Sequence, residues 1–362
     1  MEGRRGPRAA ALGIAASLLL ASVVGCSASA DPEPTTPSES GTWTAEEVAE
    51  ATGPYAVVPL FAVPKDIDDL SLAFLNPGQS YAFFAAWSQG MRDAAEFYGV
   101  TLSESDLEFK YEEALAAYEQ QSVKQPVVVG SGGGAMNETT VQAATANGSK
   151  VVLIDGGLEG AVDFGVSDEQ VGVLAVTTIA DLVKERVAGD WAGKELLVAG
   201  ITAASCAPCD ARVQASFDEA IAQFGIDESA TFRLEPPASS DPTTDAANMV
   251  TDFLTAHPDA AVVVVSYGDA PVVGAVNAAR SADRGDDVVA IASGGDATSR
   301  AALRDPANDG ILIGSIDYQP YSEGWNWVEA AIATHLGESF GAYEVTRVLT
   351  ADNVDEFYPE DE

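Results

Sequence analysis

The chain has 362 residues and a formal net charge of −38, from 56 acidic and 18 basic residues. A charge of this sign repels phosphate backbones and argues against nucleic acid as a partner. The two histidines form no His-x-x-x-His pair, and no Asp-rich calcium loop is present. We therefore expect no metal site, no cofactor and no catalysis, and we ascribe the acidity to a solvated surface.

The N-terminal segment has the layout of an export signal. Three arginines precede an apolar stretch, AAALGIAASLLLASVVG, which ends directly before Cys26. Basic residues followed by an apolar run of this length favour a secretory signal over a membrane span. The ending Val-Val-Gly-Cys resembles a bacterial lipoprotein box, which implies removal of residues 1–25 and lipidation of Cys26. A plain secretory signal or a short anchor helix remains the alternative.

Two further segments precede the part of the chain with regular patterning. Residues 26–43 are small, polar and Pro-rich, which predicts a disordered tether. Residues 44–67 form an N-terminal extension to which the sequence assigns no role. A multiply acylated N-terminus gives the stable attachment that one chain does not. We expect the protein on the extracytoplasmic face of the cell membrane, held there by lipid.

From residue 70 onward, short apolar runs alternate with amphipathic helical stretches. The runs are LSLAFL, PVVVG, KVVLID, ELLVAGI, TFRLE, AAVVVVS, DDVVAIAS and GILIGSI. This alternation predicts parallel sheets with helices on both faces. The number of units suits two doubly wound α/β lobes. Because ligands bind such sheets beyond the carboxyl ends of the strands, residues that follow the runs are candidate binding residues.

Polar and aromatic side chains follow most of these runs. They are Tyr81, Phe83, Phe84, Ser131, Asp155, Cys206, Cys209, Arg212, Asp269, Asp296, Asp317 and Tyr318. Other interpretations stay open for several of them. An aspartate before a helix is often an N-cap, and adjacent phenylalanines are also candidates for the core. The run GSGGGAMN around Ser131 lacks the Gly-Lys-Ser/Thr of a phosphate-binding loop, which favours a plain turn.

Over about residues 68–362 the chain resembles the periplasmic sugar-binding proteins of the ribose-binding type. The resemblance is carried by YGDAPVVGAVNAAR, VVAIASGGD and IGSIDYQPYSEGW. In that family these regions read as Asn-Asp before a helix, a strand ending Gly-Phe-Asp-Gly, and a strand ending in Gln before Pro. The resemblance implies a type I periplasmic binding protein-like fold with an N-lobe (68–166 and 319–345) and a C-lobe (167–318 and 346–362) joined by a hinge. It also implies a monomer that captures a sugar-like small molecule between the lobes and passes it to ABC permease subunits.

The resemblance also implies roles for particular residues. Phe83 and Phe84 match the aromatic pair that stacks on the sugar, while Asp155, Arg212 and Asp296 match residues that bind its hydroxyl groups. Three positions depart from the family: Gly268, next to Asp269, replaces a ligand-binding Asn; Asp317 or Tyr318 stands where Gln is usual; and Gly156 replaces a second Arg. These departures predict a ligand other than ribose, and the carboxylates leave a cationic ligand open.

Cys206 and Cys209 lie two residues apart, before the helical stretch that contains Arg212. An exported protein favours their oxidation, so we expect a disulfide that braces the loop and orients Arg212. Free thiols are an alternative. A thiol–disulfide oxidoreductase that uses this pair is a second possible function. A receptor module that presents its ligand to a membrane sensor is a third.

Overall fold

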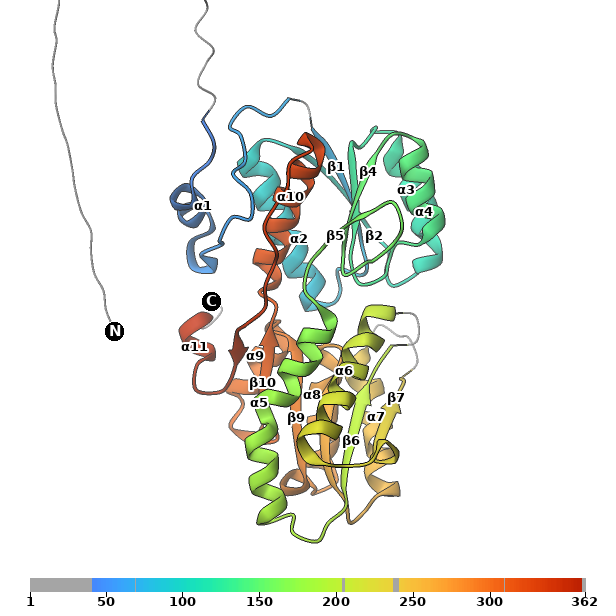
Figure 1. Cartoon of the computed structure of the whole chain (residues 1–362), viewed down its shortest axis with the longest axis vertical. Coiled ribbons are helices and arrows are strands. Elements are labelled where there is room, and N and C mark those ends of the chain that lie inside the picture. Colours follow the sequence, from blue (N-terminus) through green and yellow to red (C-terminus); the bar gives the residue numbers. More distant parts are fainter. Residues whose placement is uncertain (1–40, 69, 204–205, 237–240, 309, 360–362) are drawn as a thin grey trace, which may run out of the picture. The chain divides into compact units, whose positions relative to one another are not determined.

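The structure is a computed structural model that describes residues 41–68, 70–203, 206–236, 241–308 and 310–359 (Figure 1). The described residues belong to one compact unit. The predicted export signal, Cys26 and most of the predicted tether lie outside the described residues.

The first lobe is built on a five-stranded parallel sheet. Its strands, in the order β2-β1-β3-β4-β5, are β1 (Ser71–Asn76), β2 (Thr101–Asp106), β3 (Val128–Ser131), β4 (Lys150–Ile154) and β5 (Val162–Phe164). Alternate residues of β1 pack into two different hydrophobic cores, one on each face of the sheet. Leu72 and Phe74 pack with α2 (Ala82–Tyr98) and α10 (Pro320–Leu336), while Ala73 and Leu75 pack with α3 (Ala114–Ser122) and α4 (Glu138–Ala146). Helices therefore cover both faces.

The second lobe is built on a six-stranded sheet in the order β11-β10-β9-β8-β6-β7. Its strands are β6 (Leu196–Ile201), β7 (Thr231–Leu234), β8 (Ala261–Ser266), β9 (Val288–Gly294), β10 (Leu312–Asp317) and β11 (Val348–Leu349), and β11 alone is antiparallel to its neighbour. Its helices are α5 (Asp168–Ala188), α6 (Ala207–Phe224), α7 (Pro242–Ala256), α8 (Asp269–Ser281), α9 (Ala297–Arg304) and α11 (Val354–Phe357). Every residue of β8 is buried, as expected for a central strand covered on both faces. The predicted pair of parallel-sheet α/β lobes is confirmed.

The connections and the N-terminal extension add shorter helices. The extension carries α1 (Ala45–Thr52). Short 3₁₀ helices lie at Gly53–Tyr55, Tyr111–Glu113, Glu228–Ala230, Gly285–Asp287 and Pro306–Asn308.

Helices α2 and α10 cross in close contact because each carries a glycine at the crossing. A Cβ atom on Gly90 would lie 2.0 Å from the Tyr321 carbonyl oxygen, and one on Gly324 would lie 2.2 Å from the Trp87 carbonyl oxygen. Any larger residue at either position would push the helices apart. This contact fixes the start of α2, and with it the aromatic residues that follow β1.

Residues 41–67 pack on the α2 and α10 face of the first lobe. The ring of Trp43 lies 4.3 Å from that of Phe97, and Tyr55 stacks on Tyr321 at 3.7 Å. The backbone N–H of Leu60 donates to Glu329 on α10 at 2.7 Å. Because Glu329 is fully buried, this bond supplies part of the hydrogen bonding that its carboxyl group needs. The extension is thus part of the folded lobe.

The chain passes between the lobes three times: between β5 and α5, between β10 and α10, and between α10 and β11. Tyr343, in the third passage, contacts the other two. Its hydroxyl donates to the Tyr318 carbonyl oxygen at 2.6 Å, and its ring lies 5.6 Å from that of Phe164. The three passages therefore support one another beside the site described next.

Candidate ligand-binding site

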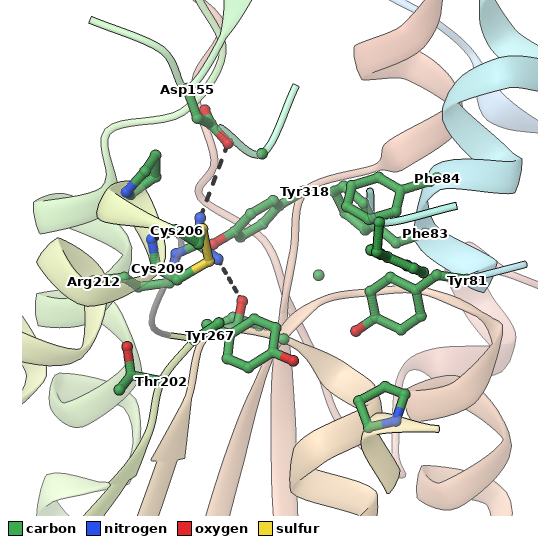
Figure 2. A pocket seen from close by; sticks show the side chains of 18 of the residues that line it. Tyr81, Phe83, Phe84, Asp155, Thr202, Cys206, Cys209, Arg212, Tyr267 and Tyr318 are labelled. Carbon is green, nitrogen blue, oxygen red and sulfur yellow. Dashed lines mark hydrogen bonds and ion pairs between the residues drawn. A yellow bond between two sulfur atoms is a disulfide. The ribbon is translucent and has the colours of Figure 1, made fainter. Parts of the chain in front are cut away.

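A cavity of about 200 Å³ is lined by residues that follow strands of both sheets (Figure 2). The first lobe contributes Asp155 and the aromatic residues Tyr81, Phe83, Phe84, Trp87, Phe109 and Tyr111. The second lobe contributes Thr202, Cys206, Cys209, Arg212, Tyr267, Ser293 and Tyr318, among others. This location, beyond the carboxyl ends of parallel strands, is where ligands bind in open α/β sheets.

Arg212 on α6 is held in place by groups from three elements. Its guanidinium donates to Asp168 at the start of α5 and to the Tyr267 carbonyl oxygen after β8. The carboxylate of Asp155, on the other lobe, lies 4.0 Å away, and the ring of Tyr318 lies 5.0 Å away. Arg212 is 6% exposed, and its Nε has no partner among the described residues. A planar group fixed in this way can donate to a ligand without first being ordered.

Asp155 directly follows β4 and has a left-handed backbone, at a φ of 54°. Two hydrogen bonds hold this turn: its N–H donates to the Phe164 carbonyl oxygen at 3.0 Å, and its carboxylate accepts from the Val166 N–H at 3.2 Å. Burial, together with the negative charge of Asp168, raises the pKa of Asp155 to about 8. The group can therefore act as a hydrogen-bond donor or acceptor near neutral pH.

Two carboxyl groups beside this pair were not predicted from the sequence. Asp168 is the main partner of Arg212, and burial raises its pKa. Glu323 on α10 is fully buried and accepts from the Trp87 indole N–H at 2.5 Å. Burial and the charge of Asp155 raise the pKa of Glu323. In the sequence, Asp168 follows the helix-capping Ser167 and has the position of an ordinary acidic residue in the first turn of a helix. Glu323 is marked in the sequence only as an acidic residue within a mostly apolar helix.

The aromatic residues form one wall of the cavity. Phe83 and Phe84 both line it, and Phe83 also belongs to the core beneath α2. The ring of Phe84 lies 5.4 Å from that of Tyr81 and 6.1 Å from that of Phe109, and the ring of Phe83 lies 5.8 Å from that of Tyr318. Edge-to-face packing of this kind gives a rigid apolar surface.

Cys206 and Cys209 form a disulfide at the start of α6 (Figure 2). Cys206 is the N-cap residue of this helix, and its sulfur accepts from the Cys209 N–H at 3.2 Å. Both residues are buried and line the cavity. The bridge therefore fixes the first turn of the helix that carries Arg212.

The other four predicted binding residues do not line the cavity, and their side chains are engaged within the protein. Ser131 donates to the Leu75 carbonyl oxygen at 2.9 Å. Asp269 accepts from Ser315 at 2.6 Å and from the Asp296 N–H at 2.7 Å. Asp296 caps α9 by accepting from the Thr298 N–H, and Asp317 is paired with Arg347.

The glycine-rich run at the end of β3 makes room for tryptophan side chains. A Cβ atom on Gly130 would lie 2.0 Å from the Trp327 ring, and one on Gly132 would lie 2.2 Å from the Trp87 ring. The packing of these rings accounts for both glycines without a bound phosphate.

The described part of the chain offers neither a metal-binding cluster nor a membrane-spanning helix. It contains no group of three or more His, Cys, Asp or Glu side chains placed to hold a metal ion. None of its helices combines the length and the hydropathy that a membrane span requires.

A family model described as "Periplasmic binding protein domain" matches residues 72–339. The chain belongs to this family. The resemblance predicted from the sequence is thereby confirmed, and the extension before residue 72 lies outside the matched periplasmic binding protein domain. A search of curated proteins finds no match.

Solved structures share the fold. The chain is similar to GanP, a glucose-galactose binding protein from Geobacillus stearothermophilus, with 16% identity, 79% of this chain and 99% of that chain covered, and a TM-score of 0.64. It is similar to an ABC transporter solute binding protein from Mycobacterium smegmatis with bound glycerol, with 19% identity, 81% of this chain and 98% of that chain covered, and a TM-score of 0.66. A third similar structure is the 5-methylthioribose transporter solute binding protein from Thermotoga lettingae, with 18% identity, 79% of this chain and 87% of that chain covered, and a TM-score of 0.63.

Proposed function

We propose that this protein is an extracytoplasmic solute-binding protein that captures a sugar or a related polar small molecule for an ABC importer. The observation that supports the proposal is the cavity, to which both lobes contribute, with Arg212 of one lobe facing Asp155 of the other. A ligand in contact with both lobes would favour their closure, because each lobe then gains contacts that it lacks when open. The solved relatives described as binding glucose and galactose, 5-methylthioribose or glycerol agree with this ligand class.

The ligand class is tested by a thermal-shift screen of the folded protein against pentoses, hexoses, polyols, nucleosides and amines. A ligand that binds only the folded state raises the melting temperature. For a ligand found in this way, we expect Arg212→Ala to weaken binding by at least about tenfold, or about 1.4 kcal/mol. The variant removes a fixed donor and leaves Asp155 and Asp168 without their cation.

The matched comparison is the Cys206→Ser/Cys209→Ser protein, which loosens the first turn of α6 but keeps the guanidinium. We expect a smaller loss of affinity, measured by calorimetry on folded protein. If the cysteine variant loses more affinity than Arg212→Ala, Arg212 is not the main polar contact. Failure of every compound in the screen to raise the melting temperature would contradict the proposed ligand class.

We further propose that the protein works as a monomer anchored to the membrane by lipid on Cys26. The support for the lipid anchor is the sequence alone: a basic leader, an apolar stretch and a cysteine at its end. Cys26→Ser should move the protein from the membrane fraction into the medium. Retention of this variant in membranes washed with high salt would argue for a membrane-spanning anchor instead.

An importer is distinguished from a sensor module by transport. Cells that lack the protein should lose uptake of the ligand and regain it with the wild-type chain. Unchanged uptake together with a lost signalling response would favour the sensor module.

A further inference from the structure

The side chain of Tyr81 extends from the first lobe to the second, where its hydroxyl lies at the start of α8. It accepts a hydrogen bond from the Ala270 N–H at 3.4 Å. A Cβ atom on Gly268 would lie 2.8 Å from this hydroxyl oxygen, so a side chain at position 268 would have to displace the tyrosine. The phenol thus fills the space in which a polar side chain at 268 would otherwise meet a ligand.

The carboxyl groups behind Tyr81 are turned away from the cavity. Asp269 accepts from Ser315 and from the Asp296 N–H, and Asp296 caps α9, so neither residue lines the cavity. Burial and the nearby charge of Asp296 raise the pKa of Tyr81, which keeps its hydroxyl protonated. At this end, Tyr81 therefore presents its ring to a ligand and directs its hydroxyl toward the protein.

The Arg212–Asp155 pair and the aromatic residues of α2 and its N-cap lie on different sides of the cavity (Figure 2). Figure 2 shows Arg212 and Asp155 on one side and Tyr81, Phe83 and Phe84 grouped on the other. Asp155 and Arg212 carry the only carboxyl and guanidinium groups among the described residues that line it. The rings of Phe83 and Phe84 offer a hydroxyl group no hydrogen bond in exchange for its lost bonds to water, whereas an apolar group there would gain from burial.

We propose that the cavity binds a sugar-like ligand that carries an apolar substituent, and that Tyr81 sets this preference by filling the end of the cavity at α8. The polyol part of the ligand meets Arg212 and Asp155, and the apolar substituent lies against Tyr81, Phe83 and Phe84. This inference rests on the proposed function and names the ligand class of the same site.

The test compares two pairs of ligands: methyl and phenyl β-glucopyranoside, which differ only in the apolar group, and ribose and 5-methylthioribose, in which a methylthio group replaces the 5-hydroxyl. Calorimetry on the wild-type protein should show the more apolar member of at least one pair binding about tenfold tighter or more. In Tyr81→Ala, this ratio should fall by about tenfold, because the emptied space exposes polar groups at α8. Tyr81→Phe, which keeps the ring, should shift the ratio in the same direction by less.

The matched control is Tyr55→Ala, since Tyr55 stacks on Tyr321 and does not line the cavity. It should leave the ratio unchanged. If the less apolar member of both pairs binds the wild type equally well or better, the inference is wrong and the proposed function stands. If Tyr81→Ala binds both members with the wild-type ratio, Tyr81 does not set the preference. If none of the four compounds binds the folded wild type, the inference falls, while the broader screen still decides the proposed function.

Discussion

Arg212 faces more negative charge than one guanidinium can neutralise. It is bonded to Asp168, lies 4.0 Å from Asp155, and also interacts with the buried Glu323. Ionising all three carboxyl groups at once would leave uncompensated charge in a poorly solvated region. Some of these groups therefore hold a proton near neutral pH, and the stability of the protein should depend on pH.

Asp155 gives this pH dependence a definite sign. Its pKa is about 8 in the folded protein, against 3.8 as the reference value. Well below pH 4 the group is protonated in both states, so the free energy of unfolding does not change with pH through this group. As the pH rises toward 8, the unfolded chain loses this proton and the folded chain keeps it, so the free energy of unfolding falls.

We expect Asp155→Asn, which cannot titrate, to lose less stability than the wild type between pH 5 and pH 8, by up to about 4 kcal/mol. Urea unfolding at both pH values measures this difference. Asp181→Asn, at an exposed position on α5, is the matched control and should follow the wild type. A variant at position 155 that loses as much stability as the wild type would contradict the assignment.

At the residue scale, the sequence indicated which residues follow a strand better than it indicated which of their side chains face the cavity. Arg212 and Asp155 follow their strands and line the cavity. Asp296 also follows its strand, but its carboxylate accepts from backbone N–H groups of α9, which was the alternative left open for an aspartate before a helix. Whether a carboxylate caps its own helix or faces the cavity depends on φ, ψ and the neighbouring strands, which local sequence does not specify.

At the element scale, the alternation of apolar runs and helices predicted the central strands because buried parallel strands are apolar on both faces. Edge strands lack that signal. β2 has the sequence TLSESD and is partly exposed along its length, and β5 and β11 have three and two residues. These edge strands form because their backbones hydrogen-bond to a neighbouring strand of the sheet, a tertiary contact that their own sequences do not signal. Similarly, the packing of residues 41–67 on α10 involves partners such as Glu329, more than 250 residues away in the sequence.

At the scale of the whole molecule, the C-terminal segment ties the second and third passages between the lobes together. Asp317 is the last residue of β10 and is fully buried. Its carboxylate accepts hydrogen bonds from Arg347, directly before β11, and from the hydroxyl of Tyr358 at 3.1 Å. The Arg347 carbonyl oxygen also accepts a hydrogen bond from the Asp317 N–H at 2.9 Å, and Tyr343, in the same passage, donates to the Tyr318 carbonyl oxygen. These bonds hold the C-terminal return of the chain against the second lobe, where it completes the sheet as β11.

Removal of Arg347 should therefore destabilise the protein far more than loss of a surface ion pair. Arg347→Ala leaves the buried carboxyl group of Asp317 without its cation, and we expect a loss of about 3–5 kcal/mol in the free energy of unfolding. Arg280→Ala, which breaks an exposed pair with Asp305, is the control and should cost less than about 1 kcal/mol. Adding Asp317→Asn to Arg347→Ala should restore part of the loss, because the unpaired charge is then gone. Urea unfolding measures all four proteins, and equal losses for Arg347→Ala and Arg280→Ala would show that the C-terminal return is not held by this ion pair.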